Sequence, residues 1–166
     1  MASEKPKNEL SKATVKSLAH GSLLIRRTLA DIKALQERSA RKLRIVATDD
    51  EPRILDLYKA YLELSCQATV LTTTSSEEAL RLAVAEPPDL FITDVMKPGI
   101  NGMELIKMLR AHERTRSVPI WVITGTADVL GAALLEVGAD VVMQKPIELA
   151  DLLHRANQLI LKREFS

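Results

Sequence analysis

The chain has 166 residues, 23 basic and 22 acidic side chains and a formal net charge of +1 at pH 7. This balance disfavours a dedicated nucleic-acid binder, so no direct DNA binding is expected. The single cysteine, Cys66, excludes an internal disulfide. No apolar run approaches membrane-spanning length and residues 1–7 lack the apolar core of a secretory signal, so we expect no membrane span and a cytoplasmic protein.

Residues 1–42 differ from the rest of the chain in charge and pattern. They carry ten basic and four acidic residues, a net charge of +6, whereas residues 43–166 carry thirteen basic and eighteen acidic residues, a net charge of −5. Spacings of three and four predict a helical extension with a seam of about three heptads. The seam residues are Val15, Leu18, Ser22, Ile25, Leu29, Ile32 and Gln36.

Three interpretations of this basic helical extension remain open. Residues 15–36 could pair with a second copy to form a homodimer, or with a helix of a partner protein. The extension could instead fold back on the acidic remainder of the chain. It could also be a mostly disordered basic arm that happens to be periodic.

From residue 43 onward, strand and helix patterns alternate five times. Continuous apolar strands favour a parallel sheet covered on both faces, and right-handed crossovers then give an α/β, doubly wound, five-stranded, flavodoxin-like three-layer sandwich. The predicted strands are Leu43–Thr48, Ala68–Leu71, Leu90–Thr93, Ile120–Ile123 and Asp140–Met143. The predicted helices are Pro52–Leu64, Ser76–Glu86, Gly102–Glu113, Ala127–Val137 and Leu149–Arg163.

Three of these strands lead into charged residues. The first runs into Asp49 and Asp50, the third into Asp94, and the fifth into Lys145. The carboxyl ends of parallel strands lie on one rim, where ligands bind. Crowded carboxylates require a cation, and oxygen ligands without His or Cys favour Mg²⁺, Mn²⁺ or Ca²⁺. A carboxylate held in this way can attack phosphorus and form an aspartyl phosphate, while metal and lysine neutralise the developing charge.

A fourth motif, Thr124-Gly125-Thr126, follows the strand Ile120–Ile123. The hydroxyl of Thr124, at the end of the strand, can bond a phosphoryl oxygen. The four motifs occur in the order Asp-Asp-Glu, Asp-x-x-x-Pro-x-x-Asn-Gly, Thr-Gly and Lys-Pro. In this order they resemble the receiver domain of two-component response regulators. The resemblance covers residues 43–166, which we treat as one domain beside the extension formed by residues 1–42.

The resemblance implies a role for each matching residue. Asp94 matches the phosphoacceptor, Thr124 the switch hydroxyl and Lys145 the amine that bonds the phosphoryl group. The implied metal ligands are Asp50, Asp94 and the backbone carbonyl of Met96, with Asp49 acting largely through water. The peptide bond between Lys145 and Pro146 is expected to be cis. The implied cofactor is Mg²⁺, for which Mn²⁺ can substitute.

Two residues depart from the family pattern. Val142 stands three positions before Lys145, where the family usually has Tyr or Phe, so switching must use another route. Lys97 stands where Met is common. It should place a charge at the bend of the loop and leave the chemistry of the site untouched.

The expected function is that of a phosphoacceptor signalling domain in a two-component phosphorelay, with no enzyme activity beyond its own phosphorylation and dephosphorylation. The implied phosphoryl donor is a histidine kinase or a histidine phosphotransfer protein. Because the last predicted helix also ends the sequence, we expect output through phosphorylation-dependent contact with an unknown protein target. One alternative is a degenerate receiver that acts as a constitutive adaptor. A flavodoxin-like cofactor-binding enzyme is disfavoured, because the acids after the first strand would repel a nucleotide.

Overall fold

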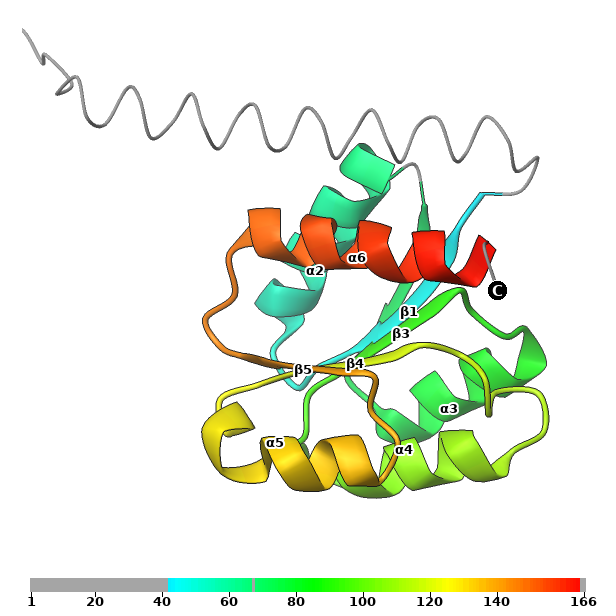
Figure 1. The fold of residues 1–166 in the computed structure, drawn as a ribbon, viewed down its shortest axis with the longest axis vertical. Helices are drawn as coiled ribbons and strands as arrows, with labels where there is room; N and C mark the ends of the chain where they lie inside the picture. Colours follow the sequence, from blue (N-terminus) through cyan, green and yellow to red (C-terminus); the bar gives the residue numbers. More distant parts are fainter. Residues whose placement is uncertain (1–41, 67, 165–166) are drawn as a thin grey trace, which may run out of the picture.

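The computed structural model describes residues 42–66 and 68–164, and these form a five-stranded parallel sheet with helices on both faces (Figure 1). The strand order is β2-β1-β3-β4-β5. The strands are β1 (Arg44–Thr48), β2 (Thr69–Thr73), β3 (Leu90–Thr93), β4 (Ile120–Thr124) and β5 (Val141–Gln144). The helices are α2 (Pro52–Cys66), α3 (Ser76–Ala85), α4 (Gly102–Ala111), α5 (Ala127–Glu136) and α6 (Leu149–Glu164).

The predicted α/β fold with five parallel strands is confirmed, and the element boundaries differ from the predicted ones by a few residues at most. Strand β2 starts and ends later than predicted, because Thr72 and Thr73 continue the ladder beside Ala47 and Thr48 of β1. Strand β5 extends to Gln144, which pairs with Thr124 of β4. These residues are polar, so the apolar pattern used to predict the strands does not include them. Only their pairing with a neighbouring strand defines where β2 and β5 end. The predicted extension lies outside the described residues, apart from Lys42.

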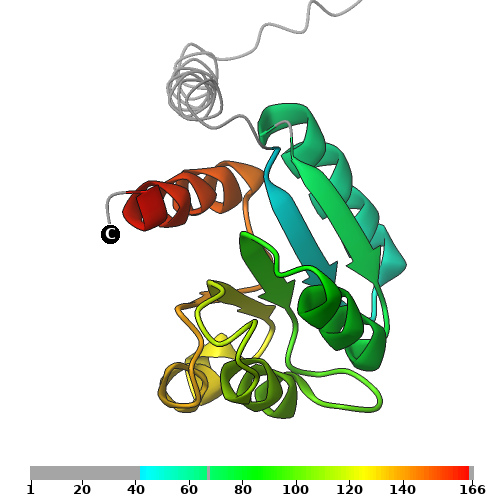
Figure 2. The same ribbon diagram turned by 90° about the vertical axis from the view of Figure 1, so that its right-hand side faces the viewer.

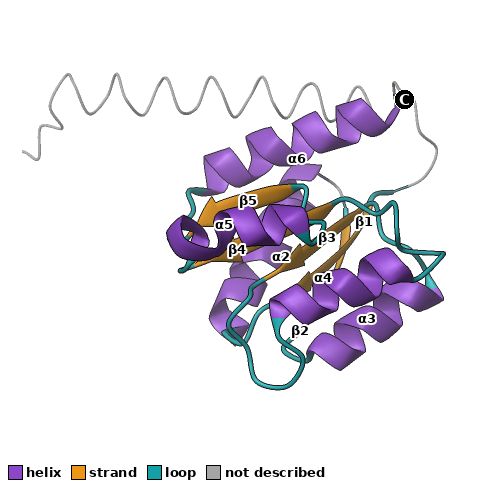
Figure 3. Ribbon diagram, turned by 60° about the horizontal axis from the view of Figure 1, so that its bottom comes forward, coloured by secondary structure: helices purple, strands orange, loops and turns teal. Residues whose placement is uncertain are grey.

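Two layers of helices cover the sheet, α2 and α6 on one face and α3, α4 and α5 on the other (Figure 2). Figure 3 shows the strands enclosed between the two layers. The alternation of side chains along each strand creates this arrangement. In β1, Ile45 and Ala47 belong to the core cluster of α2 and α6, whereas Val46 belongs to the other cluster. Both clusters are built largely from aliphatic side chains, as the scarcity of aromatic residues predicts.

Two polar side chains, those of Ser75 and Asn101, cap the N-termini of α3 and α4. Ser75 caps α3, and its hydroxyl accepts a hydrogen bond of 3.2 Å from the backbone N–H of Glu78. Asn101 caps α4, and its side-chain oxygen accepts one of 3.0 Å from the backbone N–H of Glu104. Each cap satisfies an N–H group that the first helical turn leaves without a partner.

Arg110, in the last turn of α4, links that helix to the start of β4 and β5. Its guanidinium donates four hydrogen bonds to groups in the segments that precede β4 and β5. The acceptors are the backbone oxygens of Gly138 (2.9 Å), Arg116 (3.1 Å) and Val118 (2.6 Å) and the carboxylate of Asp140 (2.8 Å). The same carboxylate accepts a hydrogen bond of 2.7 Å from the backbone N–H of Ile120.

Replacing Arg110 with methionine should lower the free energy of unfolding by about 2 kcal/mol, because several carbonyls would lose a charged donor. Urea denaturation followed by circular dichroism measures the change. Lys107→Met on the same helix is the matched control; its side chain is exposed, so a change within about 0.5 kcal/mol is expected. Equal stabilities of the two variants would contradict a structural role for the guanidinium.

Cys66 is a free, buried thiol at the end of α2. Burial raises its pKa to about 12, so the thiol stays protonated and unreactive near neutral pH. Across the described part of the chain, none of the helices combines the length and hydropathy that a membrane crossing requires.

Candidate metal centre

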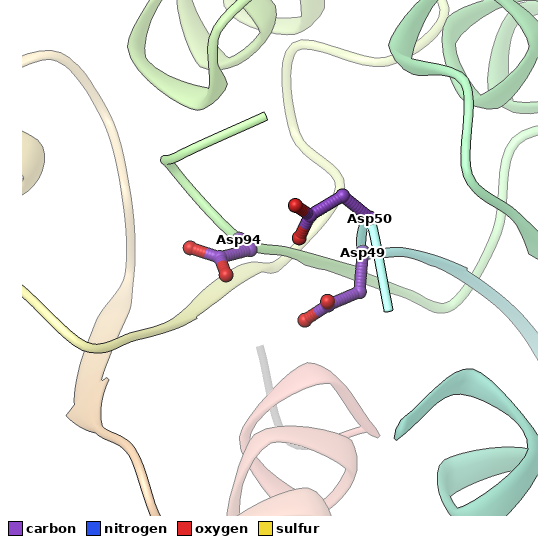
Figure 4. Close-up of side chains that lie close together, drawn as sticks. All are labelled: Asp49, Asp50 and Asp94. Carbon is purple, nitrogen blue, oxygen red and sulfur yellow. The ribbon is translucent and has the colours of Figure 1, made fainter. Parts of the chain in front are cut away.

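Three carboxylates meet at the carboxyl ends of β1 and β3. The two strands are adjacent and parallel, with Thr48 paired to Thr93, so the residues that follow them emerge side by side. One carboxylate oxygen from each of Asp49, Asp50 and Asp94 lies within 4.8 Å of the others. Figure 4 shows the three side chains together at this rim. Asp49 and Asp94 are buried, whereas Asp50 is exposed.

Lys145 joins the cluster from the turn after β5. Its ammonium group donates a hydrogen bond of 2.7 Å to Asp49 and another of 2.7 Å to Asp94. Glu51 lies 3.9 Å away at the solvent side. The Lys145–Pro146 peptide bond is cis, as predicted. One lysine therefore bridges the two buried carboxylates.

Asp94 is held by the loop that follows it as well as by Lys145. Its second oxygen accepts hydrogen bonds from the backbone N–H groups of Val95 and Met96. The N–H of Gly102 donates a hydrogen bond of 3.0 Å to the carbonyl of Val95, the residue after Asp94. This bond brings the end of the loop back beside Asp94. A Cβ atom on Gly102 would stand only 2.4 Å from the carbonyl oxygen of Asp94. The Asn-Gly pair of the motif therefore has two physical roles, a helix cap and a close backbone contact.

The pKa values of the two buried acids shift in opposite directions. Burial raises the pKa of Asp49, and the hydrogen bonds from Lys145 and the backbone N–H of Glu51 only partly oppose it. For Asp94 burial acts in the same sense, but Lys145, the Thr124 hydroxyl and the Met96 N–H together lower its pKa. Asp94 is thus ionised more readily than its neighbour.

Lys145 carries a firm positive charge. Burial alone would lower the pKa of its ammonium group, but the hydrogen bonds to Asp49 and Asp94 and the charges of these two acids together outweigh burial and raise the pKa above the ordinary value for lysine. The lysine is therefore charged at any physiological pH. It offers a fixed cation beside Asp94.

Thr124 ends β4 close to this cluster, and a glutamine holds its loop in place. The Thr124 hydroxyl lies 3.2 Å from the hydroxyl of Thr126. The side-chain amide of Gln144 donates to the carbonyl of Gly125 at 2.8 Å and accepts from the N–H of Ala127 at 2.9 Å. Sequence reasoning did not single out Gln144. The one feature of the sequence that could have pointed to Gln144 is its position directly before Lys145.

Lys97 is the second residue whose position the sequence did not reveal. Its side chain is 9% exposed, and its ammonium group donates a hydrogen bond of 2.8 Å to the Thr48 hydroxyl. Thr48 directly precedes the acids Asp49 and Asp50. The lysine is therefore buried beside the acid cluster, whereas the sequence predicted only a charge at the bend of the loop.

The donor set fits a hard divalent cation. Its ligand atoms are all oxygens, as Mg²⁺ prefers. Two ligands on opposite sides of Mg²⁺ are about 4.2 Å apart, because each Mg–O bond is about 2.1 Å. Carboxylate oxygens that lie within 4.8 Å of one another are close enough to share one such cation, directly or through a bridging water molecule. Met96 lies two residues after Asp94 in the same loop, so its backbone carbonyl is a candidate for a further oxygen ligand.

Comparison with known proteins places the chain in a family. The model of the response regulator receiver domain matches residues 45–157. The chain therefore belongs to the response regulator receiver domain family, whose members are signalling domains of two-component systems.

Curated relatives share the same region. The alkaline phosphatase synthesis transcriptional regulatory protein PhoP of Bacillus subtilis is 35% identical over 124 residues, which are 74% of this chain and 50% of PhoP. The transcriptional regulatory protein PrrA of Mycobacterium tuberculosis is 33% identical over 121 residues, 72% of this chain and 51% of PrrA. The chain thus spans about half the length of the curated relatives it matches. Its predicted lack of direct DNA binding stays a prediction.

Solved structures of similar fold include a CheY-like receiver domain protein from Methanospirillum hungatei, with a TM-score of 0.68 and 28% identity over 75% of this chain and 98% of that one. Another is the receiver domain of a sensor histidine kinase from Pseudomonas aeruginosa, with a TM-score of 0.66 and 25% identity over 72% of this chain and 98% of that one. The latter structure has a magnesium ion coordinated in its active-site cleft.

Proposed function

We propose that this chain accepts a phosphoryl group on Asp94 in a Mg²⁺-dependent reaction and signals through phosphorylation-dependent protein contact in a two-component phosphorelay. The observation that carries the proposal is the position of Lys145, 2.7 Å from both Asp94 and Asp49 within a cluster of three acids. A partly buried lysine shared by two carboxylates provides a cation for an anionic group that joins Asp94. A sheet edge with a merely structural role would not need this concentration of charge.

In this proposal Asp50, Asp94 and the Met96 carbonyl hold Mg²⁺ or Mn²⁺, and Asp49 acts largely through water. When bound, the cation would neutralise charge on the phosphoryl oxygens. The lowered pKa of Asp94 keeps its carboxylate ionised and ready to act as the nucleophile. Lys145 then donates a hydrogen bond to a phosphoryl oxygen, and the Thr124 hydroxyl donates another.

The transfer step conserves atoms and charge. An Asp94 carboxylate oxygen forms a bond to phosphorus while the bond between phosphorus and the donor group breaks, and the donor group keeps that electron pair. With acetyl phosphate the leaving group is acetate. In the cell, the donor would be a phosphohistidine of a histidine kinase or histidine phosphotransfer protein, and the chain would act in the cytoplasm.

The output in this proposal is a change in binding to a protein target. Residues 43–166 act as the receiver, and residues 1–42 form a separate extension whose self-association remains a prediction. Val142 cannot supply the aromatic switch of the family. The Gln144 contacts between β5 and the loop after Thr124 offer another route by which movement of Thr124 reaches the surface.

The decisive experiment is labelling with acetyl phosphate that carries a radioactive phosphoryl group. We expect the protein to take up about one phosphoryl group with Mg²⁺ or Mn²⁺ and none with EDTA, because the acids bind the donor only through a cation. Asp94→Ala should abolish the labelling. The label should be released by alkali and by hydroxylamine, as acyl phosphates are.

Asp56→Ala is the matched control, because Asp56 is an exposed acid on α2 that does not belong to the cluster of Asp49, Asp50 and Asp94. It should be labelled like the parent protein. Undiminished labelling of Asp94→Ala, or labelling in EDTA, would refute the proposal. A complete absence of labelling in the folded parent protein would favour the degenerate receiver that acts as a constitutive adaptor.

A further inference from the structure

A buried lysine without a role in the proposed phosphoryl transfer lies against the acid cluster. Lys97 sits in the loop after β3, yet its side chain turns inward and its ammonium group bonds the Thr48 hydroxyl at 2.8 Å. Val46, two residues before Thr48, belongs to the core cluster shared with α3, α4 and α5. Since side chains alternate along a strand, the Thr48 hydroxyl faces the same layer. Lys97 therefore reaches the rim from the side of α3, α4 and α5.

The surroundings of the Lys97 ammonium group are strongly acidic. Burial lowers its pKa to about 8, and the charges of Asp49, Asp94, Asp50 and Glu77 oppose that shift. Glu77, in the first turn of α3, faces the loop, since one of its carboxylate oxygens lies 3.0 Å from the Cβ position of Gly99. Among the described residues, the one hydrogen-bond partner of this amine is the neutral hydroxyl of Thr48. The acids around it, more than that one bond, offset the cost of burying the charge.

We propose that Lys97 is a built-in cation of the acid cluster that weakens the binding of Mg²⁺ at the site. This inference rests on the metal site of the proposed function and adds to it a residue that sets metal affinity. Lys97 touches neither the phosphoryl group nor the metal in this account. It acts through charge alone.

The charge balance gives the direction of the effect. Three carboxylates against Lys145 alone would leave two net negative charges for a divalent cation, whereas Lys97 reduces this to one. Each incoming Mg²⁺ is also repelled by the extra ammonium group. Without Mg²⁺, the same charge relieves the repulsion among the carboxylates. The protein thus carries part of its own counter-charge, and needs more Mg²⁺ to fill the site than it would with a neutral residue at position 97.

The experiment is a calorimetric titration of the full chain with MgCl₂, for the parent protein, Lys97→Met and Lys97→Gln. Both neutral variants should bind Mg²⁺ about tenfold more tightly, the order expected for removing one repulsive charge from a partly screened site. The rise in thermal midpoint produced by a fixed Mg²⁺ concentration should grow in parallel, because ligand stabilisation follows the dissociation constant. Glutamine retains a polar end that can reach Thr48, so the test survives if the methionine variant folds poorly.

Lys107→Met is the matched control, since it removes an exposed lysine on α4, and it should bind Mg²⁺ like the parent protein. Equal affinities of the parent and both Lys97 variants would overturn the role of Lys97 and leave the metal site standing. An effect in Lys97→Met that Lys97→Gln does not share would also overturn it, because packing would then be the cause. If neither the parent nor the variants bind Mg²⁺, the proposed metal site itself fails.

Discussion

Replacing Gly102 with alanine should lower the free energy of unfolding by about 3 kcal/mol, at the upper end of the usual cost of overpacking. The new Cβ atom would stand 2.4 Å from the carbonyl oxygen of Asp94 and 2.6 Å from the Cα of Val95. Both are backbone atoms, so no side-chain rotation relieves the contact. The start of α4 must move away from the end of β3, and Asp94 moves with it. Urea denaturation measures the loss, and phosphoryl labelling should fall in the same variant.

Gly125→Ala is the matched control for this prediction. Gly125 also lies at the rim, but nothing stands within 4 Å of its Cβ position. Its substitution should change stability by less than about 0.5 kcal/mol. If Gly102→Ala proves as stable as Gly125→Ala, the close approach of α4 to the backbone of Asp94 is not what makes glycine necessary there.

Replacing Lys145 with methionine should destabilise the protein by about 2 to 3 kcal/mol in the absence of divalent cations. The change leaves Asp49 and Asp94 buried without their shared partner, and removing one member of a buried ion pair costs about 3 to 5 kcal/mol. The smaller value is expected because the Lys145 side chain is 16% exposed and solvent screens part of the charge. Saturating Mg²⁺ should restore much of the loss, because the cation replaces the missing positive charge.

Urea denaturation with EDTA and with MgCl₂ provides this comparison. Lys59→Met serves as control, because Lys59 is 45% exposed and lies 3.9 Å from Glu63 on the surface of α2. Such a pair contributes at most about 1 kcal/mol, and Mg²⁺ should not affect its loss. A Lys145→Met protein as stable in EDTA as the parent would show that the two carboxylates do not depend on the lysine.

Much of the architecture could be predicted because it depends on local patterns. The apolar run Phe91-Ile92 before Thr93 and Asp94 predicts both a buried strand and a carboxylate at its end. A parallel sheet then brings the ends of neighbouring strands together without any knowledge of side-chain conformation. The proximity of Asp49, Asp50 and Asp94 was accessible for that reason. The ends of β2 at Thr73 and of β5 at Gln144 could not be predicted, because these residues are polar and only their pairing with the neighbouring strand makes them part of the sheet.

Contacts between distant segments could not be predicted in the same way. Lys97 and Thr48 are 49 positions apart, and the inward turn of the lysine depends on a loop whose path is set by Gly102 and by the backbone around Asp94. A lysine is usually solvated, so its type gave no signal of burial. The bridge from Arg110 to Asp140 is equally invisible, because any exposed pair of opposite charges looks alike in a sequence.

The contacts of Gln144 have a consequence for the cost of binding a phosphoryl group. Backbone and side-chain hydrogen bonds tie the end of β4 to the end of β5, since Lys145 donates its N–H to the carbonyl of Thr124 at 2.9 Å and Gln144 spans Gly125 and Ala127. The main chain that carries the hydroxyl and the ammonium group proposed to receive the phosphoryl oxygens is therefore preorganised. Its freedom is lost when the chain folds, so little of that entropy remains to oppose the arrival of the anion.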